Sequence, residues 1–274
     1  MQKSLSRNPR VFSLVNIIKP ALSALLQISV LLIGLSWILH TGADAMNYQW
    51  QWERVPDYLF FFEEGQWYSA ELIDGLLVTL KLTAFSGVIA LLFAIVTALL
   101  RLSDSKVGRG LAFGYVELIR NTPLLVQIYL LYFVFGPYLG MERFNTAVFA
   151  LALFQGAYAA EVLRSGLLAI DKGQFEACRA LGLSPWHTYF HIILPQVVKL
   201  TLPSLTNELI SLVKNTSIVS VMAIFDLTTE GRNIVSDTAM PFEIWFSVAA
   251  IYLCLTLSLS LIAAWLEKRA RKEN

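Results

Sequence analysis

The sequence predicts an all-α transmembrane protein with six membrane-spanning helices. Hydrophobic residues make up 56% of the 274-residue chain and charged residues only 15%, whereas soluble domains carry roughly 25% charged residues. Six mostly apolar segments approach or reach the length of about 20 residues that crosses a bilayer core of roughly 30 Å. Phe, Tyr and Trp make up 12% of the chain, and such residues gather at the two membrane surfaces. A soluble protein is therefore excluded.

The charge and the cysteine content exclude several other classes. A net charge of +1 gives no basic surface field for nucleic acid, so we expect no nucleic-acid partner. Cys178 and Cys254 lie far apart and form neither a disulfide framework nor a metal-ligand spacing. We therefore expect no metal site. We expect membrane lipid to surround the apolar helices.

The first predicted span covers residues 21–39, which carry no charge. The basic residues before it resemble the start of a signal peptide. However, the apolar stretch exceeds the usual core of about 7–15 residues, and no Ala-x-Ala-like cleavage site follows. We therefore predict a retained helix. The loop after it, residues 40–74, is acidic and rich in Trp and Tyr, which favours a belt on the membrane surface and leaves a docking surface for an external partner open.

Five further spans are predicted along the rest of the chain, at residues 76–100, 115–135, 146–168, 195–213 and 244–266. The third is interrupted by the polar run Arg120-Asn121-Thr122-Pro123. The orientation follows from Lys and Arg, which accumulate on the cytoplasmic side. With the N-terminus inside, fifteen of these residues lie in inside segments and four in outside segments. We therefore expect six spans and both termini in the cytoplasm.

The connection between the fourth and fifth spans predicts two short helices joined by a sharp turn. Asp171, followed by Gln three residues later, is a near capping box that starts a helix. Gly182 suits the left-handed residue after the helix end. Ser184 is a typical N-cap, with Pro185 as the first residue of the second helix. We expect Pro195 to end that second helix because proline disrupts a helix interior.

This connection resembles the EAA signature of ABC importer permeases, which have the type I importer fold. The match consists of Glu176-Ala177-Cys178, then Gly182, then Ile192-x-Leu194-Pro195. Flanking segments resemble the polar amino-acid branch: residues 120–127, residues 156–161 with Arg164 and Gly166, Gly173-Gln174, and Lys214-Asn215-Thr216-Ser217. The resemblance covers about residues 76–266. It divides the chain into an N-terminal addition (1–75), a five-span permease core (76–267) and a basic tail (268–274).

The resemblance implies partners and a location. The two short helices would be a coupling hairpin that docks in a groove of a cytoplasmic ATPase, through Glu176, Ala177, Cys178, Gly182, Leu194 and Pro195. Small side chains there would permit close approach, and Glu176 would pair with a basic group. The expected assembly holds two ATPase subunits, a second permease (identical or similar) and an extracytoplasmic amino-acid-binding protein. The expected location is the bacterial cytoplasmic, or inner, membrane.

The chain holds no recognisable energy-converting or catalytic motif. No Gly is followed by Lys, so a phosphate-binding P-loop is absent. We therefore expect no cofactor in this chain, with ATP used by partner subunits, and no enzymatic activity. His187 and His191 lie one helical turn apart, but no third metal ligand accompanies them. We interpret them as interfacial aromatic residues.

Polar residues inside spans are costly and usually line a cavity or pair with each other. The candidates for a substrate path are Arg120, Asn121, Thr122, Pro123, Glu161 with Arg164, Asn207 with Glu208, Lys214, Asn215, Thr216 and Ser217. We expect Pro123 to leave nearby backbone groups free for a ligand. Residues 218–225 are too few to span and predict a re-entrant half-helix or gate.

These groups suit a zwitterionic amino acid. A cation such as Arg120 or Lys214 would meet its carboxylate, and Glu161 would meet its ammonium group. Two other interpretations stay open: an intrahelical Glu161–Arg164 pair, and Arg120 at the level of the lipid headgroups.

Four functions are compared. The sequence favours a permease subunit of an importer for polar amino acids. The alternative is a permease of the same fold for another small solute, such as an organic ion or an opine-like compound. An autonomous ion-coupled transporter should show broken helices in two related halves, and only one broken region is found. A membrane enzyme lacks any catalytic constellation.

Overall fold

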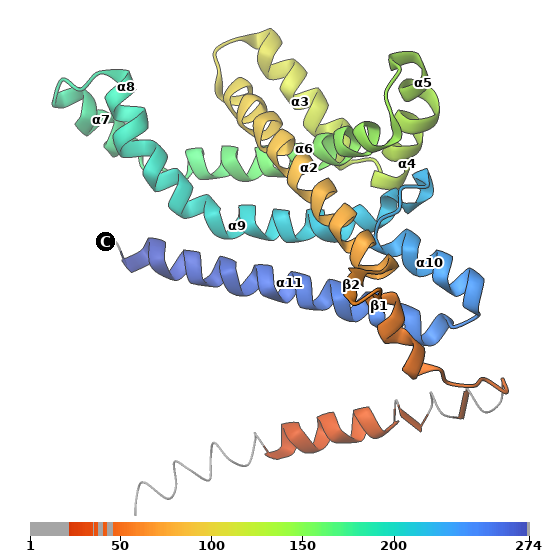
Figure 1. Ribbon diagram of the computed structural model, residues 1–274. Coiled ribbons are helices and arrows are strands. Elements are labelled where there is room, and N and C mark those ends of the chain that lie inside the picture. Colours follow the sequence, from red (N-terminus) through yellow and green to blue (C-terminus); the bar gives the residue numbers. More distant parts are fainter. Residues whose placement is uncertain (1–21, 35, 38–40, 43–45, 273–274) are drawn as a thin grey trace, which may run out of the picture. The chain divides into compact units, whose positions relative to one another are not determined.

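A computed structural model describes residues 22–34, 36–37, 41–42 and 46–272 of the protein (Figure 1). The chain separates into two compact units, Met1–Gln51 and Trp52–Asn274. In the first unit, Leu22–Gly34 forms a short apolar helix. The remainder of the predicted span 21–39 falls partly outside the described residues, as do the basic residues before it, so this span stays a prediction.

The second unit begins with a small element that the all-α prediction missed. A 3₁₀ helix (Trp52–Tyr58) leads into strands β1 (Phe60–Glu63) and β2 (Gln66–Ser69), which pair antiparallel. Phe, Tyr and Trp have high strand propensity, and the turn between the strands is made by Glu64 and Gly65, both with positive φ. Every residue of both strands is exposed. The fold is otherwise helical.

Three helices of this unit are long and apolar enough to cross a membrane (Figure 1): α2 (Glu71–Leu102), α6 (Arg143–Leu168) and α11 (Pro241–Lys272). They contain the predicted segments 76–100, 146–168 and 244–266. Two bent helix pairs raise the number of possible spans within the described residues to five. Helix α11 continues through most of the predicted tail.

The predicted third span, residues 115–135, is broken at the polar run that was expected to interrupt it, but its helices extend beyond the predicted bounds. Helix α3 already begins at Lys106 and ends at Arg120, and the chain then bends by 109°. The outgoing part comprises α4 (Leu124–Tyr129), a π-helical segment (Leu130–Phe135) and α5 (Gly136–Leu139). The bend has a local cause: Pro123 takes an extended conformation with ψ 137° and cannot donate a backbone hydrogen bond.

Two backbone carbonyls at this bend are not free, which limits the expectation that Pro123 leaves backbone groups open to a ligand. The buried Gln127 side chain reaches back over the break, and its Nε2 lies 2.8 Å from Ile119 O and 3.0 Å from Thr122 O. Its amide thus satisfies the carbonyls that end α3. Polar backbone groups inside a membrane protein need such a partner, and a glutamine one turn into the next helix supplies it here.

The predicted first short helix between the fourth and fifth spans, the turn after it and the start of a second helix are confirmed. Helix α7 (Lys172–Ala180) is capped by Asp171, whose carboxylate accepts from Gly173 N at 2.6 Å. Gly182 has φ +70°, and the backbone bonds Gly182 N to Arg179 O and Leu183 N to Cys178 O complete the turn. Ser184 then caps α8 (Pro185–His187).

The expectation that Pro195 ends the second helix is wrong. The chain stays helical from α8 through a π-helical segment (Thr188–Ile193) into α9 (Leu194–Asn215). Leu194 N donates to Tyr189 O, five residues back. The π-helical segment ends two residues before Pro195. The helix can therefore continue through Pro195, although this residue has no backbone N–H to donate. A proline near the start of an α-helical segment is tolerated for this reason.

The segment after α9 is a 3₁₀ helix (Thr216–Met222) rather than a half-helix over 218–225. Ala223 then takes a left-handed conformation with φ 51°, and α10 (Leu227–Thr238) follows after a bend of 50°. The buried Asp226 carboxylate caps α10 by accepting from the N–H groups of Thr228 and Thr229.

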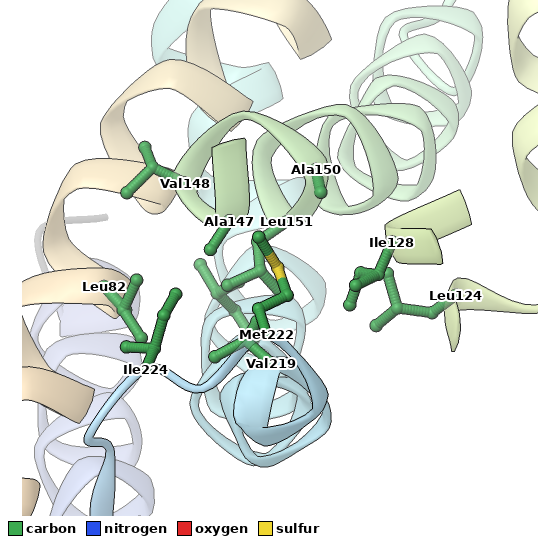
Figure 2. Close-up of a cluster of buried hydrophobic side chains, with 11 residues drawn as sticks. Leu82, Leu124, Ile128, Ala147, Val148, Ala150, Leu151, Val219, Met222 and Ile224 are labelled. Atoms are coloured by element: carbon green, nitrogen blue, oxygen red, sulfur yellow. The ribbon is translucent and has the colours of Figure 1, made fainter. Parts of the chain in front are cut away.

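The main core lies where α2, α4, α6, α9 and the 3₁₀ segment meet. Figure 2 shows side chains from these elements converging, with Leu82, Ile128, Leu151 and Met222 among them. Helix α6 is the best-covered long helix, with 61% of its most apolar stretch buried inside the chain, against 11% for α11. Apolar surface left on α2 and α11 therefore faces lipid or other helices.

Candidate functional site

A pocket of about 460 Å³ lies between α6, α9 and the end of α3. Helix α6 contributes residues spaced by three or four, so they share one face. The lining residues are Arg120, Tyr158, Glu161, Val162, Ser165, Gly166, Ala169, Leu200, Thr201, Ser204 and Glu208. The pocket thus combines one cation, two carboxylates and four hydroxyl side chains with a few apolar groups.

The cation of the pocket is Arg120, the last residue of α3. Its guanidinium carbon lies 5.3 Å from the centre of the Tyr158 ring, a cation–π distance. Within the described part of the chain, no carboxylate lies at ion-pair distance from Arg120. Its five donors are therefore available to an anionic group in the pocket.

The two carboxylates of the pocket are held differently. Glu161 is engaged by Arg164, whose Nε lies 3.0 Å from both Glu161 oxygens and whose Nη2 also bonds Oε1. Glu208, half-buried on α9, accepts one hydrogen bond from the Gln155 amide. Glu208 is thus the carboxylate without a cationic neighbour at bonding distance.

The structure brings three of the predicted path residues, Arg120, Glu161 and Glu208, into this pocket. The others lie outside its lining. Asn121 and Thr122 bond the carbonyls of Glu117 and Leu118 in their own helix. Pro123 forms the bend, and Asn207, Lys214 and Asn215 lie elsewhere along α9. The hydroxyls of Thr216 and Ser217 turn back onto the carbonyls of Val213 and Lys214.

Several lining residues were missed from the sequence, among them Tyr158, Ser165, Thr201 and Ser204. A signal for them exists. Tyr158 lies three residues before Glu161 and Ser165 four residues after it, so all three share one face of α6. Ser204 and Glu208 lie one helical turn apart on α9. Which of these faces meet required knowledge of the packing of α6 against α9.

The helical hairpin of α7 and α8 presents mixed polar and apolar surface. Glu176 and Ala177 are exposed, as are Leu181 and Trp186, at 77% and 64%. Cys178, in contrast, is only 3% exposed, so its small side chain packs within the hairpin rather than on its outer surface. Leu194 and Pro195 are exposed at the start of α9.

The two histidines of this region stack on each other. The rings of His187 and His191 are 5.1 Å apart with an interplanar angle of 18°. Among the described residues, no group of three or more His, Cys, Asp or Glu side chains is arranged to hold a metal ion.

Long apolar helices around a charged pocket, with an exposed helical hairpin at the end of one of them, define a membrane transport component. The comparison with known proteins gives the family: the chain belongs to the binding-protein-dependent transport system inner membrane components, whose family model matches residues 71–272. The match begins at the first residue of α2. It places the chain in the inner membrane and implies a substrate-binding protein and an ATPase as separate components of the system.

Two curated relatives illustrate the similarity. The nopaline transport system permease protein NocM of Agrobacterium fabrum is 34% identical over 209 residues, covering 71% of this chain and 87% of NocM. The probable glutamine ABC transporter permease protein GlnM of Bacillus subtilis is 35% identical over 201 residues, covering 73% of this chain and 93% of GlnM.

A solved crystal structure agrees. It is described as an amino acid ABC transporter with histidines, and is 40% identical with a TM-score of 0.67, covering 73% of this chain and 94% of that chain.

Proposed function

We propose that this chain is the permease subunit of an ATP-driven importer for polar amino acids, and that the pocket between α6 and α9 holds the solute during transport. The proposal rests on two opposite charges in one pocket. The Arg120 guanidinium has no carboxylate at ion-pair distance among the described residues, and the Glu208 carboxylate has no cation at that distance. A zwitterion offers both complementary charges. The relatives that transport glutamine and cystine support the same solute class.

In this proposal the solute carboxylate binds Arg120 and its ammonium group binds Glu208. This differs from the sequence-based expectation that Glu161 meets the ammonium group, because Arg164 already engages Glu161. The hydroxyls of Ser165, Thr201 and Ser204 line the space left for the solute side chain. A polar side chain suits them.

The assembly that we propose contains a second permease, identical or similar, and two ATPase subunits that bind the α7–α8 hairpin. The exposed Glu176 and Ala177 and the apolar Leu181 and Trp186 support the hairpin as the contact. This chain binds no nucleotide of its own. We further propose six spans with both termini in the cytoplasm.

The test is uptake by the complete complex in proteoliposomes, with L-glutamine, L-cystine and L-arginine as probes. Replacing Arg120→Gln or Glu208→Gln removes one charged hydrogen bond, which contributes about 1.5–3 kcal/mol. The KM for uptake should therefore rise roughly 10- to 100-fold. Asn207→Ala, on the same helix but outside the lining, is the matched control. Wild-type KM in both charge variants would contradict the pocket as the solute site.

A second solute class is favoured by one observation, the 34% identity to a nopaline permease. Nopaline is an opine, a conjugated amino acid. Competition of nopaline against labelled glutamine decides between the two: stronger inhibition by nopaline than by unlabelled glutamine would establish the opine-like solute as the preferred one.

A further inference from the structure

Arg101, near the end of α2, is largely buried but does not have, among the described residues, a hydrogen-bond acceptor for each of its buried guanidinium nitrogens. Its side chain is 16% exposed, and its Nη1 is buried without a hydrogen-bond partner in the described part of the chain. Its guanidinium carbon lies 5.2 Å from the centre of the Phe113 ring on α3. A buried donor without an acceptor costs about 1–3 kcal/mol. The conformation described here therefore leaves Arg101 one acceptor short.

The nearest carboxylate to Arg101 is that of Glu161, which already has a partner. Arg101 Nη2 lies 4.0 Å from Glu161 Oε2, at the outer limit of an ion pair. Arg164, three residues further along α6, holds the same carboxylate at 3.0 Å through Nε. Glu161 thus stands between two guanidinium groups, one on its own helix and one on α2.

The position of this group connects the pocket to the hairpin. Glu161 lines the pocket. Helix α6 ends at Leu168, one turn beyond Arg164, and Asp171, the cap of α7, follows three residues later. Glu161 and Arg164 lie on the same helix, so a displacement of α6 by the hairpin would change the distance from Glu161 to Arg101 on α2.

We propose that Glu161 exchanges Arg164 for Arg101 during transport, and that the exchange withdraws its carboxylate from the pocket wall when the hairpin moves. This rests on the proposed function of the pocket. In the second state both Nη1 and Nη2 of Arg101 donate hydrogen bonds to the Glu161 carboxylate, so Nη1 gains the acceptor that it lacks here. The pocket then loses one negative charge and holds a cationic group less tightly. Arg101 is a positioning residue and does not contact the solute.

The test compares variants in the complete complex, reconstituted in proteoliposomes with L-glutamine, L-cystine and L-arginine as probes. Arg101→Gln should lower the maximal uptake rate about tenfold, in the range of coupling energies for contacting residues, while the KM stays within about twofold of wild type. In a Glu161→Gln background the same change should have no further effect, because the exchange is already lost. Arg109→Gln, an exposed arginine on α3, is the control and should transport normally.

Arg101→Lys covers the case in which Arg101→Gln fails to assemble. An ammonium group keeps the charge but lacks the fork that takes both carboxylate oxygens, so the rate should still fall severalfold. A wild-type rate in either variant, a raised KM in place of a lower rate, or multiplied effects in the double variant would overturn the proposal. Failure of the pocket proposal itself is separate: it appears as wild-type KM in Arg120→Gln and Glu208→Gln, whatever Arg101→Gln does.

Discussion

Two glycine residues are required by different constraints. Gly182 has φ +70° in the turn between α7 and α8, a conformation that side chains with a Cβ adopt at a cost of about 1–2 kcal/mol. Gly166 is required for space: a Cβ there would lie 2.1 Å from Thr201 Cγ2 on α9. One glycine therefore shapes the hairpin, and the other sets how closely α6 and α9 approach around the pocket.

Replacing Gly182→Val should reduce both ATPase binding and uptake at least tenfold, because a β-branched residue resists the left-handed turn. Co-purification of the ATPase and uptake by proteoliposomes measure the two effects. Gly182→Asn is the matched control, since asparagine tolerates this conformation. Equal activity in the two variants would show that the turn geometry is unimportant for coupling.

Replacing Gly166→Ala should destabilise the complex by about 1–3 kcal/mol through overpacking against α9. Thermal unfolding of the detergent-solubilised complex provides the measurement. The second change Thr201→Ser removes the clashing methyl group and should restore most of the stability. If Gly166→Ala alone unfolds at the wild-type temperature, α6 and α9 pack less closely than described.

Among the elements, the bend between α3 and α4 decides where the cation of the pocket lies. Arg120 ends α3 directly before the 109° bend. Pro123 permits the bend, and the Gln127 amide binds the carbonyls that the bend leaves behind. Among the residues of the bend, Arg120 is the one that lines the pocket.

Replacing Gln127→Leu should destabilise the complex by about 1–3 kcal/mol for each carbonyl left without a partner. The thermal unfolding midpoint should fall further than in Gln196→Leu, where one half-buried bond to Ile192 O is lost. Equal midpoints in the two variants would mean that other groups satisfy the bend.

For the whole molecule, the direction of the long helices places two surfaces at opposite ends. The β1–β2 hairpin directly precedes the start of α2, and α7 directly follows the end of α6, which runs in the same direction as α2 (Figure 1). A membrane crossed by both helices separates the β-hairpin from the α7–α8 hairpin. The excess of Lys and Arg on the side of the α7–α8 hairpin supports our proposal that this side faces the cytoplasm.

Labelling of single cysteines checks this orientation. In a Cys178→Ala, Cys254→Ser background, Glu63→Cys should react with a membrane-impermeant maleimide in intact spheroplasts. Glu176→Cys should react only after permeabilisation. Both glutamates are exposed in the chain, so accessibility within the chain does not separate them. The reverse pattern would invert the orientation, and labelling of both positions in intact cells would contradict a spanning arrangement.

Local features were predictable because their causes are local. The caps by Asp171 and Ser184 and the turn at Gly182 depend on residues within one or two helical turns. The break at Pro123 was also predictable, but its 109° angle and the bonds of Gln127 were not, since they depend on what packs around them. The continuation through Pro195 was missed because a π turn before a proline has no clear sequence pattern.

Composition and short-range patterns are enough to predict that this protein lies in a membrane, that its apolar segments are helices, and that a two-helix module of the importer-permease type interrupts them. Which polar side chains share a pocket becomes clear from the packed helices alone. Arg120, Glu161 and Glu208 come from three helices, and the bend after α3 and the close approach of α6 and α9 bring them together. A pocket between helices depends on their relative placement, which no single helix encodes.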